Sequence, residues 1–208
     1  KIDELGIFDK IYIQPASGDA GGSLGAALSA NHMYFNKDRL YSKDYDLMKG
    51  SYLGPYFSDK EIIKSNKKHK AVYQHIGSFK KLSKTVAKLI SEGNVVGWFQ
   101  GRSEFGPRAL GNRSILADPR NPEMQKKLNL KIKYREGFRP FAPSVLEEEY
   151  KNFFEGKAIS PYMLMVKKVR DEIKMKTPEG YWNLNYWDKL YTKRSKLQSV
   201  THVDFSAR

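Results

Sequence analysis

The chain has 208 residues, and its 37 lysines and arginines exceed its 23 aspartates and glutamates to give a formal net charge of +14. Hydrophobic residues make up 40% of the chain and cysteine is absent, so a packed core is possible while disulfides, thiolate metal sites and a cysteine nucleophile are excluded. The positive excess favours an anionic partner such as a nucleotide, a phosphorylated metabolite or a nucleic acid. No apolar run reaches the ~18 residues of a membrane-spanning helix and no signal peptide opens the chain, so we expect a cytoplasmic protein without membrane contact.

The first residues predict a short strand over 11–14, a glycine-rich turn (PASGDAGG) and an alanine-rich helix (SLGAALSANHMYF). Small residues in the turn bring backbone N–H groups close to a ligand, and the helix N-terminus near Gly22 favours an anion there. Asp19 is the acidic residue of this turn. It is a candidate metal ligand or, alternatively, an ordinary helix cap.

Residues 36–75 lack a clear hydrophobic period and are predicted to be a connector. Within it, Ser58 precedes Glu61 by three residues, which is the capping box of a helix that starts near Asp59.

From residue 78 onward, strands and helices are predicted to alternate. Apolar residues at helical spacing indicate a helix that starts near Ser78 and ends at Gly93. Further strands are predicted over 94–99, 114–119, 141–146, 162–169 and 199–205, and further helices over 121–132 and 147–156. This alternation favours an α/β or α+β fold. Residues 180–196 are aromatic and basic without a period, and they are predicted to form a surface lobe or a partner contact.

The stretch 101–124 (GRSEFGPRALGNRSILADPRNPEM) is unusually rich in arginine for a loop shaped by glycine. Its arginines are Arg102, Arg108, Arg113 and Arg120. A guanidinium offers a planar fork that matches phosphate or carboxylate oxygens, and a loop after a buried strand is where α/β proteins place ligands. The stretch lacks the Gly-x-x-x-x-Gly-Lys-Ser/Thr pattern of a Walker loop.

Two further groups of charged and polar residues follow, one in KIKYREGFRPFAPS and one in the final HVDFSAR. The first contains Lys131, Lys133, Arg135 and Arg139, and the second contains His202, Asp204, Ser206 and Arg208. The members of the first group alternate like residues on one face of an extended segment. We expect the three groups to converge on a polyanion. The alternative is that these cations pair with neighbours such as Glu104, Asp118 and Glu136 or face solvent.

Three long motifs resemble the carboxy-terminal domain of the O-carbamoyltransferase family, which includes nodulation-factor, cephamycin and tobramycin carbamoyltransferases. They are GWFQGRSEFGPRALGNRSILADPRNPEM, LNLKIKYREGFRPFAPSVL and THVDFSAR. The segment PASGDAGGSLGAAL resembles the last motif of the family's actin-like amino-terminal domain. The resemblance implies that residues 1–35 end an actin-like domain in a strand and a helix. It also implies that residues 76–208 form a YrdC-like twisted open sheet with flanking helices, cut short at its carboxy end.

The resemblance further implies an ATP-dependent carbamoyltransferase. The YrdC-like domain would convert carbamoyl phosphate and ATP to carbamoyl-adenylate, and the actin-like domain, holding Fe²⁺ or Mg²⁺, would pass the carbamoyl group to an acceptor hydroxyl. Two anionic substrates repel each other, so fixed cations are needed to bring them together. Matching positions imply catalytic roles for Arg102, Lys133, Arg135 and His202, substrate or nucleotide contacts for Arg108, Arg113, Arg139, Ser206, Arg208, Gly21 and Gly22, and a metal contact for Asp19.

The chain departs from the family pattern in two places. The family's His-x-x-x-His metal pair is missing, since the histidines are His32, His69, His75 and His202. The family's segment of the type Asn-Thr-Ser-Phe-Asn, after the final motif, is also missing. We therefore expect a piece of a longer protein that does not complete carbamoyl transfer alone. The acceptor stays open among sugar, aminoglycoside, lipo-oligosaccharide and cephem compounds.

Two other function classes remain. A basic RNA-binding module would stack bases on Tyr181, Trp182, Tyr186 and Trp187. The clustering of arginines in glycine-shaped loops rather than on an open aromatic sheet argues against a nucleic-acid partner. A purely structural or interaction domain is the other class, for which the aromatic segment 181–191 is a candidate homodimer contact.

Overall fold

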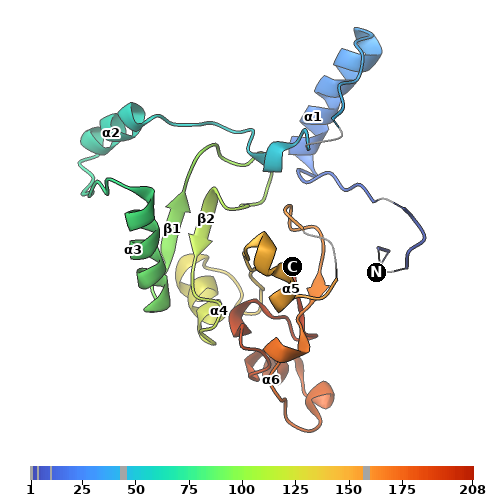
Figure 1. The fold of residues 1–208 in the computed structure, drawn as a ribbon, viewed down its shortest axis with the longest axis vertical. Helices are drawn as coiled ribbons and strands as arrows, with labels where there is room; N and C mark the ends of the chain where they lie inside the picture. The colour runs from blue at the N-terminus through green and yellow to red at the C-terminus, as the bar shows by residue number, and fades with distance from the viewer. Residues whose placement is uncertain (1, 4, 10, 43–45, 157–159) are drawn as a thin grey trace. The chain divides into compact units, whose positions relative to one another are not determined.

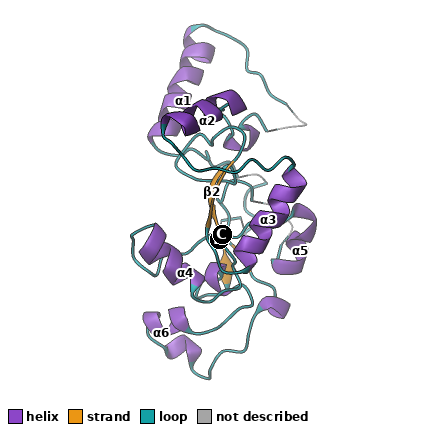
Figure 2. Cartoon of the chain, turned by 90° about the vertical axis from the view of Figure 1, so that its left-hand side faces the viewer, coloured by secondary structure: helices purple, strands orange, loops and turns teal. Residues whose placement is uncertain are grey.

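The structure is a computed structural model that describes residues 2–3, 5–9, 11–42, 46–156 and 160–208 (Figure 1). Helices joined by long loops dominate it, and the strands are short (Figure 2). The expected α+β class is confirmed. The chain divides into two compact units, of which unit 1 comprises Lys1–Ser65 and Phe99–Ser114, and unit 2 comprises Asn66–Trp98 and Ile115–Arg208.

No helix in the described part of the chain is both long and apolar enough to cross a membrane.

The glycine-rich turn leads into helix α1 (Asp19–Ser29), which continues as a π-helical turn over Ala30–Tyr34. The helix therefore begins three residues before the predicted start at Gly22. The predicted strand over 11–14 is wrong, because these residues have irregular backbone. A strand forms when a neighbouring strand pairs with its N–H and C=O groups, and no described strand lies beside this segment.

Helices α2 (Asp59–Lys68) and α3 (Phe79–Ser91) follow the cap signals of the sequence closely. The predicted capping box is confirmed, since the Ser58 N–H donates to Glu61 Oε2 at 2.8 Å and the Glu61 N–H to Ser58 Oγ at 3.4 Å. At the start of α3, Ser78 Oγ accepts from the Lys81 N–H at 3.2 Å.

The described strands form two separate two-stranded sheets. Strand β1 (Val96–Phe99) pairs with β2 (Arg113–Leu116), and β3 (Lys167–Lys168) pairs antiparallel with β4 (Ser206–Ala207). The predicted strands over 94–99, 114–119 and 162–169 are confirmed in part. Those over 141–146 and 199–205 are wrong, since the first is irregular and the second contains turns.

Three short α-helices follow, α4 (Met124–Lys127), α5 (Tyr150–Phe153) and α6 (Tyr186–Tyr191), and the described residues also contain short 3-10 helices over Lys49–Ser51, Glu147–Glu149, Asp171–Ile173, Tyr181–Asn183 and Gln198–Val200. The predicted helix over 121–132 begins later than expected, because Asn121 lies in a turn where its side chain accepts from the Glu123 N–H at 2.9 Å, and α4 begins at Met124. Helix α6 was not expected in the aromatic stretch. Its start is marked by Asn185, whose side chain accepts from the Asp188 N–H at 3.0 Å.

A small core in unit 2 supports the carboxy-terminal residues. Phe154, Val169 and Ala207 are buried together, and Tyr150, Phe153 and Ile173 pack against them. This core anchors strand β4, which carries Ser206, one of the predicted site residues.

Candidate functional site

Residues 100–113, which contain the first part of the arginine-rich stretch and which we call the arginine loop, connect β1 to the start of β2. The base of this loop is closed by the Gln100 N–H, which donates to the Asn112 carbonyl at 3.0 Å. Gly106 and Gly111 have φ of 114° and 117°, a region that favours glycine. The prediction that glycine shapes this loop is confirmed.

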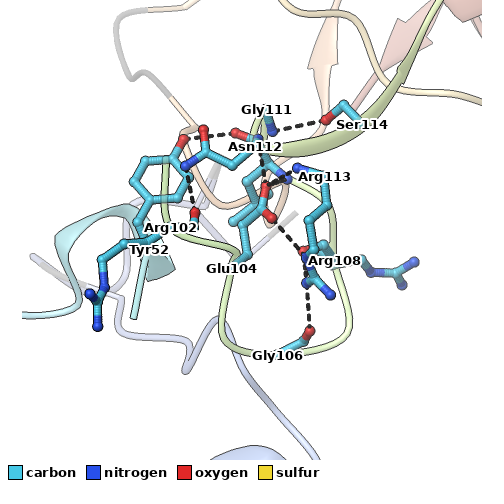
Figure 3. A network of polar contacts seen from close by, with 10 residues as sticks. Tyr52, Arg102, Glu104, Gly106, Arg108, Gly111, Asn112, Arg113 and Ser114 are labelled. Carbon is cyan, nitrogen blue, oxygen red and sulfur yellow. Dashed lines mark hydrogen bonds and ion pairs between the residues drawn. The ribbon is translucent and has the colours of Figure 1, made fainter. Parts of the chain in front are cut away.

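A single buried carboxylate organises the loop (Figure 3). Glu104 Oε1 accepts from the backbone N–H groups of Leu110 at 2.6 Å and Asn112 at 2.9 Å. Its Oε2 accepts from Arg113 Nε at 3.0 Å, and the Glu104 side chain has no exposed surface. Glu104 therefore satisfies N–H groups on the far side of the loop that would otherwise lie unpaired.

These contacts fix the charge of Glu104. Burial acts to raise the pKa of this carboxyl, but the hydrogen bonds from Leu110, Arg113 and Asn112 outweigh burial and lower the pKa to about 2. Glu104 is thus an anion at neutral pH.

The four arginines of the stretch fall into two classes. Arg113 pairs with Glu104, and Arg120 pairs with Asp118 at 2.7 Å, as the salt-bridge alternative predicts for these two residues. Arg102 and Arg108 are exposed, and their guanidinium groups make no hydrogen bond or ion pair within the described residues. In Figure 3 these two side chains point away from the network on opposite sides.

The arginine loop also touches the glycine-rich turn within unit 1. A Cβ at Gly106 would lie 3.0 Å from the Cβ of Ala16, which has no exposed surface. Two segments that the sequence singles out separately are therefore neighbours, and a side chain at 106 would be crowded against Ala16 at a φ that favours glycine.

A third segment supports the loop and was not expected from the sequence. The Phe105 N–H donates to the Ser51 carbonyl at 2.6 Å, and the Gly54 N–H donates to the Ser103 carbonyl at 2.9 Å. The Tyr52 hydroxyl donates to the Leu110 carbonyl at 2.8 Å. Part of the predicted connector thus buttresses the loop. The Gly-Pro pair in SYLGPY is a sequence signal of this close approach between the two backbone segments.

The predicted contacts in the glycine-rich turn have different surroundings. Asp19 is the exposed first residue of α1 and does not cap it, since Gly18 holds the cap position. A Cβ at Gly21 would lie 2.6 Å from the Ala16 carbonyl oxygen, whereas Gly22 has open space around it. Among the described residues no three His, Asp or Glu side chains gather as metal ligands, so Asp19 alone does not fit a metal site.

The Lys133 segment is not extended, which corrects the predicted alternation along one face. Leu128–Ile132 form a π-helical turn that follows α4, and Tyr134 has a positive φ of 49°. Lys133 is exposed, and its ammonium makes no hydrogen bond or ion pair with the described residues. A surface depression of about 530 Å³ is lined by four other residues of this segment, Leu130, Tyr134, Arg135 and Glu136.

A buried amide holds the two arginines of this segment. Asn129, with no exposed surface, accepts from Arg135 Nε at 2.7 Å and donates to the Arg139 carbonyl at 2.9 Å. The Arg135 guanidinium also lies over the Phe141 ring at 4.9 Å. Arg139 pairs with Glu136 at 2.8 Å, again as the salt-bridge alternative predicts.

The carboxy-terminal residues form a short chain of hydrogen bonds. The Ser206 hydroxyl donates to Asp204 Oδ1 at 2.6 Å, and His202 Nδ1 lies 3.1 Å from the same hydroxyl oxygen. His202 Nε2 is buried and finds no hydrogen-bond partner among the described residues. Burial, together with the positive charges of Arg194 and Arg208, lowers the pKa of His202 although Asp204 acts to raise it. Arg208 donates from Nε to the Met163 carbonyl at 2.6 Å.

Arg194, which the sequence analysis did not identify, stabilises this segment through hydrogen bonds to backbone carbonyls. It is only 1% exposed, and its guanidinium donates to the carbonyls of Leu190 at 2.8 Å, Thr201 at 2.6 Å and His202 at 3.0 Å. Burial lowers the pKa of Arg194, whose ordinary value is so high that it stays charged. A lone arginine inside a polar, aromatic stretch gives no sequence signal of this role.

The aromatic stretch is only partly available to a ligand. Tyr181 is 2% exposed, and its hydroxyl donates to the Val203 carbonyl at 2.7 Å. It therefore cannot stack on a base, which removes one of the four residues of the RNA-binding alternative. Trp182, Tyr186 and Trp187 are exposed.

Known proteins resemble the chain along almost its whole length. It is 53% identical over 205 residues to the uncharacterized protein sll1178 of Synechocystis, covering 98% of the chain and 33% of that protein. It is 38% identical over 211 residues to nodulation protein NolNO of Sinorhizobium fredii, covering 100% of the chain and 27% of that protein. It is 29% identical over 205 residues to a 3'-hydroxymethylcephem-O-carbamoyltransferase of Streptomyces clavuligerus, covering 99% of the chain and 32% of that enzyme.

The chain thus spans about a third of the length of the curated relatives it matches. Residues 87–208, which include the arginine loop and the carboxy-terminal segment, match the family described as carbamoyltransferase C-terminus. The chain therefore belongs to the carbamoyltransferase family, and residues 87–208 are its carboxy-terminal region.

Proposed function

We propose that the chain is part of an ATP-dependent O-carbamoyltransferase and acts in the activation of carbamoyl phosphate. The observation that carries the proposal is the arginine loop inside the family region, where Arg102 and Arg108 hold guanidinium groups without partners among the described residues. Solvent-facing cations whose backbone is held by the hydrogen bonds of the loop are suited to bind phosphate oxygens.

The proposed reaction produces a carbamoyl-adenylate. Water releases phosphate from carbamoyl phosphate, and a carbamate oxygen then attacks the α-phosphorus of ATP. The P–O bond to the β-phosphate breaks and pyrophosphate leaves. The carbamoyl group next passes from the adenylate to an acceptor hydroxyl, with AMP as the leaving group. Cations placed against the phosphate oxygens reduce the repulsion between the anionic reactants and stabilise the charge of the transition state.

The residues present suggest a division of roles. Arg102 and Arg108 bind phosphate oxygens, while Arg113 stays paired with Glu104 and fixes the loop. His202, whose lowered pKa keeps it neutral at pH 7, offers Nε2 as a proton acceptor. The remaining proposed substrate or nucleotide contacts are Lys133, Arg135, Arg139, Ser206, Arg208, Gly21 and Gly22.

The finer fold assignment belongs to the same proposal. Residues 76–208 would form a YrdC-like domain, and residues 1–35 would end an actin-like domain. In the intact protein that domain would use a divalent metal ion, for which Asp19 alone does not form a site. The acceptor is proposed to be a small hydroxyl compound, as the name of the cephem-carbamoylating relative indicates for that enzyme.

Exchange of labelled pyrophosphate into ATP, dependent on carbamoyl phosphate, tests the proposal in the intact protein. We expect Arg102→Ala and Arg108→Ala each to slow exchange by roughly 10- to 100-fold, since each removes a charge-assisted hydrogen bond. Arg120→Ala is the matched control, because this arginine of the same stretch is already paired with Asp118. Exchange that needs no carbamoyl phosphate, or that Arg102→Ala and Arg108→Ala leave at the wild-type rate, would refute the proposal.

A further inference from the structure

We propose that Glu104 is the positioning residue of the arginine loop: it sets the backbone from which Arg102 and Arg108 point to opposite sides, each available to bind an anionic ligand (Figure 3). The identity of that anion as a substrate rests on the proposed function, whereas the positioning itself rests on the loop geometry.

The first connection runs from Glu104 to Arg102 through Asn112. Glu104 Oε1 accepts from the Asn112 N–H at 2.9 Å, and the Asn112 side-chain amide donates to the Arg102 carbonyl at 2.6 Å. Asn112 is only 8% exposed, so its side chain has little freedom to turn away. The backbone position of Arg102 thus depends on Glu104 through two consecutive hydrogen bonds.

The second connection runs from Glu104 to Arg108 through Arg113. Glu104 Oε2 accepts from Arg113 Nε at 3.0 Å, and Arg113 Nη2 lies 3.5 Å from the Arg108 carbonyl and 3.4 Å from that of Gly106. These longer contacts steady the backbone on the second arm of the loop (Figure 3). One carboxylate is therefore connected to the backbone of both loop arginines whose guanidinium groups lack partners among the described residues.

The burial of Glu104 matters for an anionic ligand. Its charge offsets that of Arg113, which leaves the charges of Arg102 and Arg108 to act on a ligand. An exposed carboxylate at this place would repel the same ligand, but the Glu104 side chain has no exposed surface. Its charge acts on the loop from inside, through hydrogen bonds that are stronger for being charge-assisted.

Binding of inorganic pyrophosphate to the intact protein, measured by titration calorimetry, tests this role in a double-mutant cycle. We expect Glu104→Gln to weaken binding at least tenfold, and Arg102→Ala to do likewise. In the double variant the two losses should not multiply, because Glu104 acts through Arg102 and Arg108. Asp118→Asn is the control, because it neutralises another carboxylate of the same stretch, 8% exposed, whose ion-pair partner Arg120 is not assigned to the ligand.

Amide hydrogen exchange provides a readout that does not depend on any ligand. Glu104→Gln should speed amide hydrogen exchange at Leu110 and Asn112, whose N–H groups donate to Glu104 Oε1. Helix α3 should stay as protected as in the wild type. Should the Gln variant fail to fold, Glu104→Asp keeps the charge on a shorter side chain and is expected to show the same local loss.

The outcomes separate this inference from the proposed function. One outcome is that pyrophosphate binds with a non-additive double-mutant cycle, but no exchange of pyrophosphate into ATP depends on carbamoyl phosphate. That outcome would support the positioning role and refute the proposed function. Normal exchange of pyrophosphate into ATP, with a pyrophosphate affinity that Glu104→Gln leaves unchanged, would support the proposed function and refute the positioning role. Fully multiplicative losses, or amide exchange at Leu110 and Asn112 that Glu104→Gln leaves unchanged, would overturn the positioning role, and a wild type that binds no pyrophosphate would overturn the anionic ligand.

Discussion

In the arginine loop a buried carboxylate gathers backbone N–H groups, whereas in the carboxy-terminal segment a buried guanidinium gathers backbone carbonyls. Glu104 holds Leu110 and Asn112, and Arg194 holds Leu190, Thr201 and His202. We call Glu104 the carboxylate hub and Arg194 the guanidinium hub, because each binds several backbone groups. The carboxylate hub leaves Arg102 and Arg108 of its loop exposed, whereas the guanidinium hub is itself an arginine with a structural role. A basic chain therefore contains two kinds of arginine, and only the contacts of each distinguish them.

The largest expected effect comes from removing the guanidinium hub. Arg194→Met should destabilise unit 2 by about 3 to 5 kcal/mol, because several buried carbonyls lose their donor at once. Thermal unfolding of the intact protein measures the loss. Arg170→Ala is the control, since Arg170 pairs with Glu172 at the surface, and its unfolding temperature should barely change. Equal shifts in the two variants would show that Arg194 is not a hub.

The second-largest effect is expected at low pH, where protonation of Glu104, the carboxylate hub, should destabilise the protein. The folded pKa of Glu104 is about 2, below its ordinary value of 4.5. Glu104 therefore contributes stability that is fully present above pH 4.5 and is lost as the pH falls toward 2, on the order of 3 kcal/mol. Other carboxylates titrate in the same range, so the measurement is the difference between wild type and Glu104→Gln in unfolding free energy at each pH. A difference that does not vary between pH 5 and 2.5 would contradict the assignment.

A smaller effect is expected where the loop meets the glycine-rich turn. Gly106→Ala places a methyl group 3.0 Å from the Ala16 Cβ at a φ of 114°, and should cost about 1 to 2 kcal/mol. Gly25→Ala, in α1 with open space around it, should instead stabilise the protein by about 0.5 to 1 kcal/mol. Urea unfolding of both variants checks the contrast, and a Gly106→Ala protein as stable as the wild type would show that the contact is not tight.

Local signals in the sequence predicted the local features of the fold. The capping box of Ser58 and Glu61, the helix start near Ser78 and the glycine-shaped loop each depend on residues a few positions apart. The strand over 11–14 failed for the opposite reason. Its pattern is strand-like, but a strand requires a partner that the pattern does not supply.

The candidate site shows the same limit. Sequence alone identified the arginines of the loop but not that Arg113 and Arg102 differ, because the difference arises from Glu104 lying inside the loop. Arg194 was missed because its partners are carbonyls, which every residue carries. The buttress from Tyr52 joins residues 58 positions apart, a distance that no local pattern spans.

The products formed from ATP and carbamoyl phosphate, with no acceptor present, test the central claim most directly. Phosphorus NMR of the reaction of the intact protein should show phosphate from carbamoyl phosphate, and pyrophosphate together with carbamoyl-adenylate or the AMP derived from it. Arg102→Ala should form these products at least tenfold more slowly, consistent with the loss of one charge-assisted contact. Formation of ADP in place of AMP or carbamoyl-adenylate, or no consumption of ATP, would contradict the account.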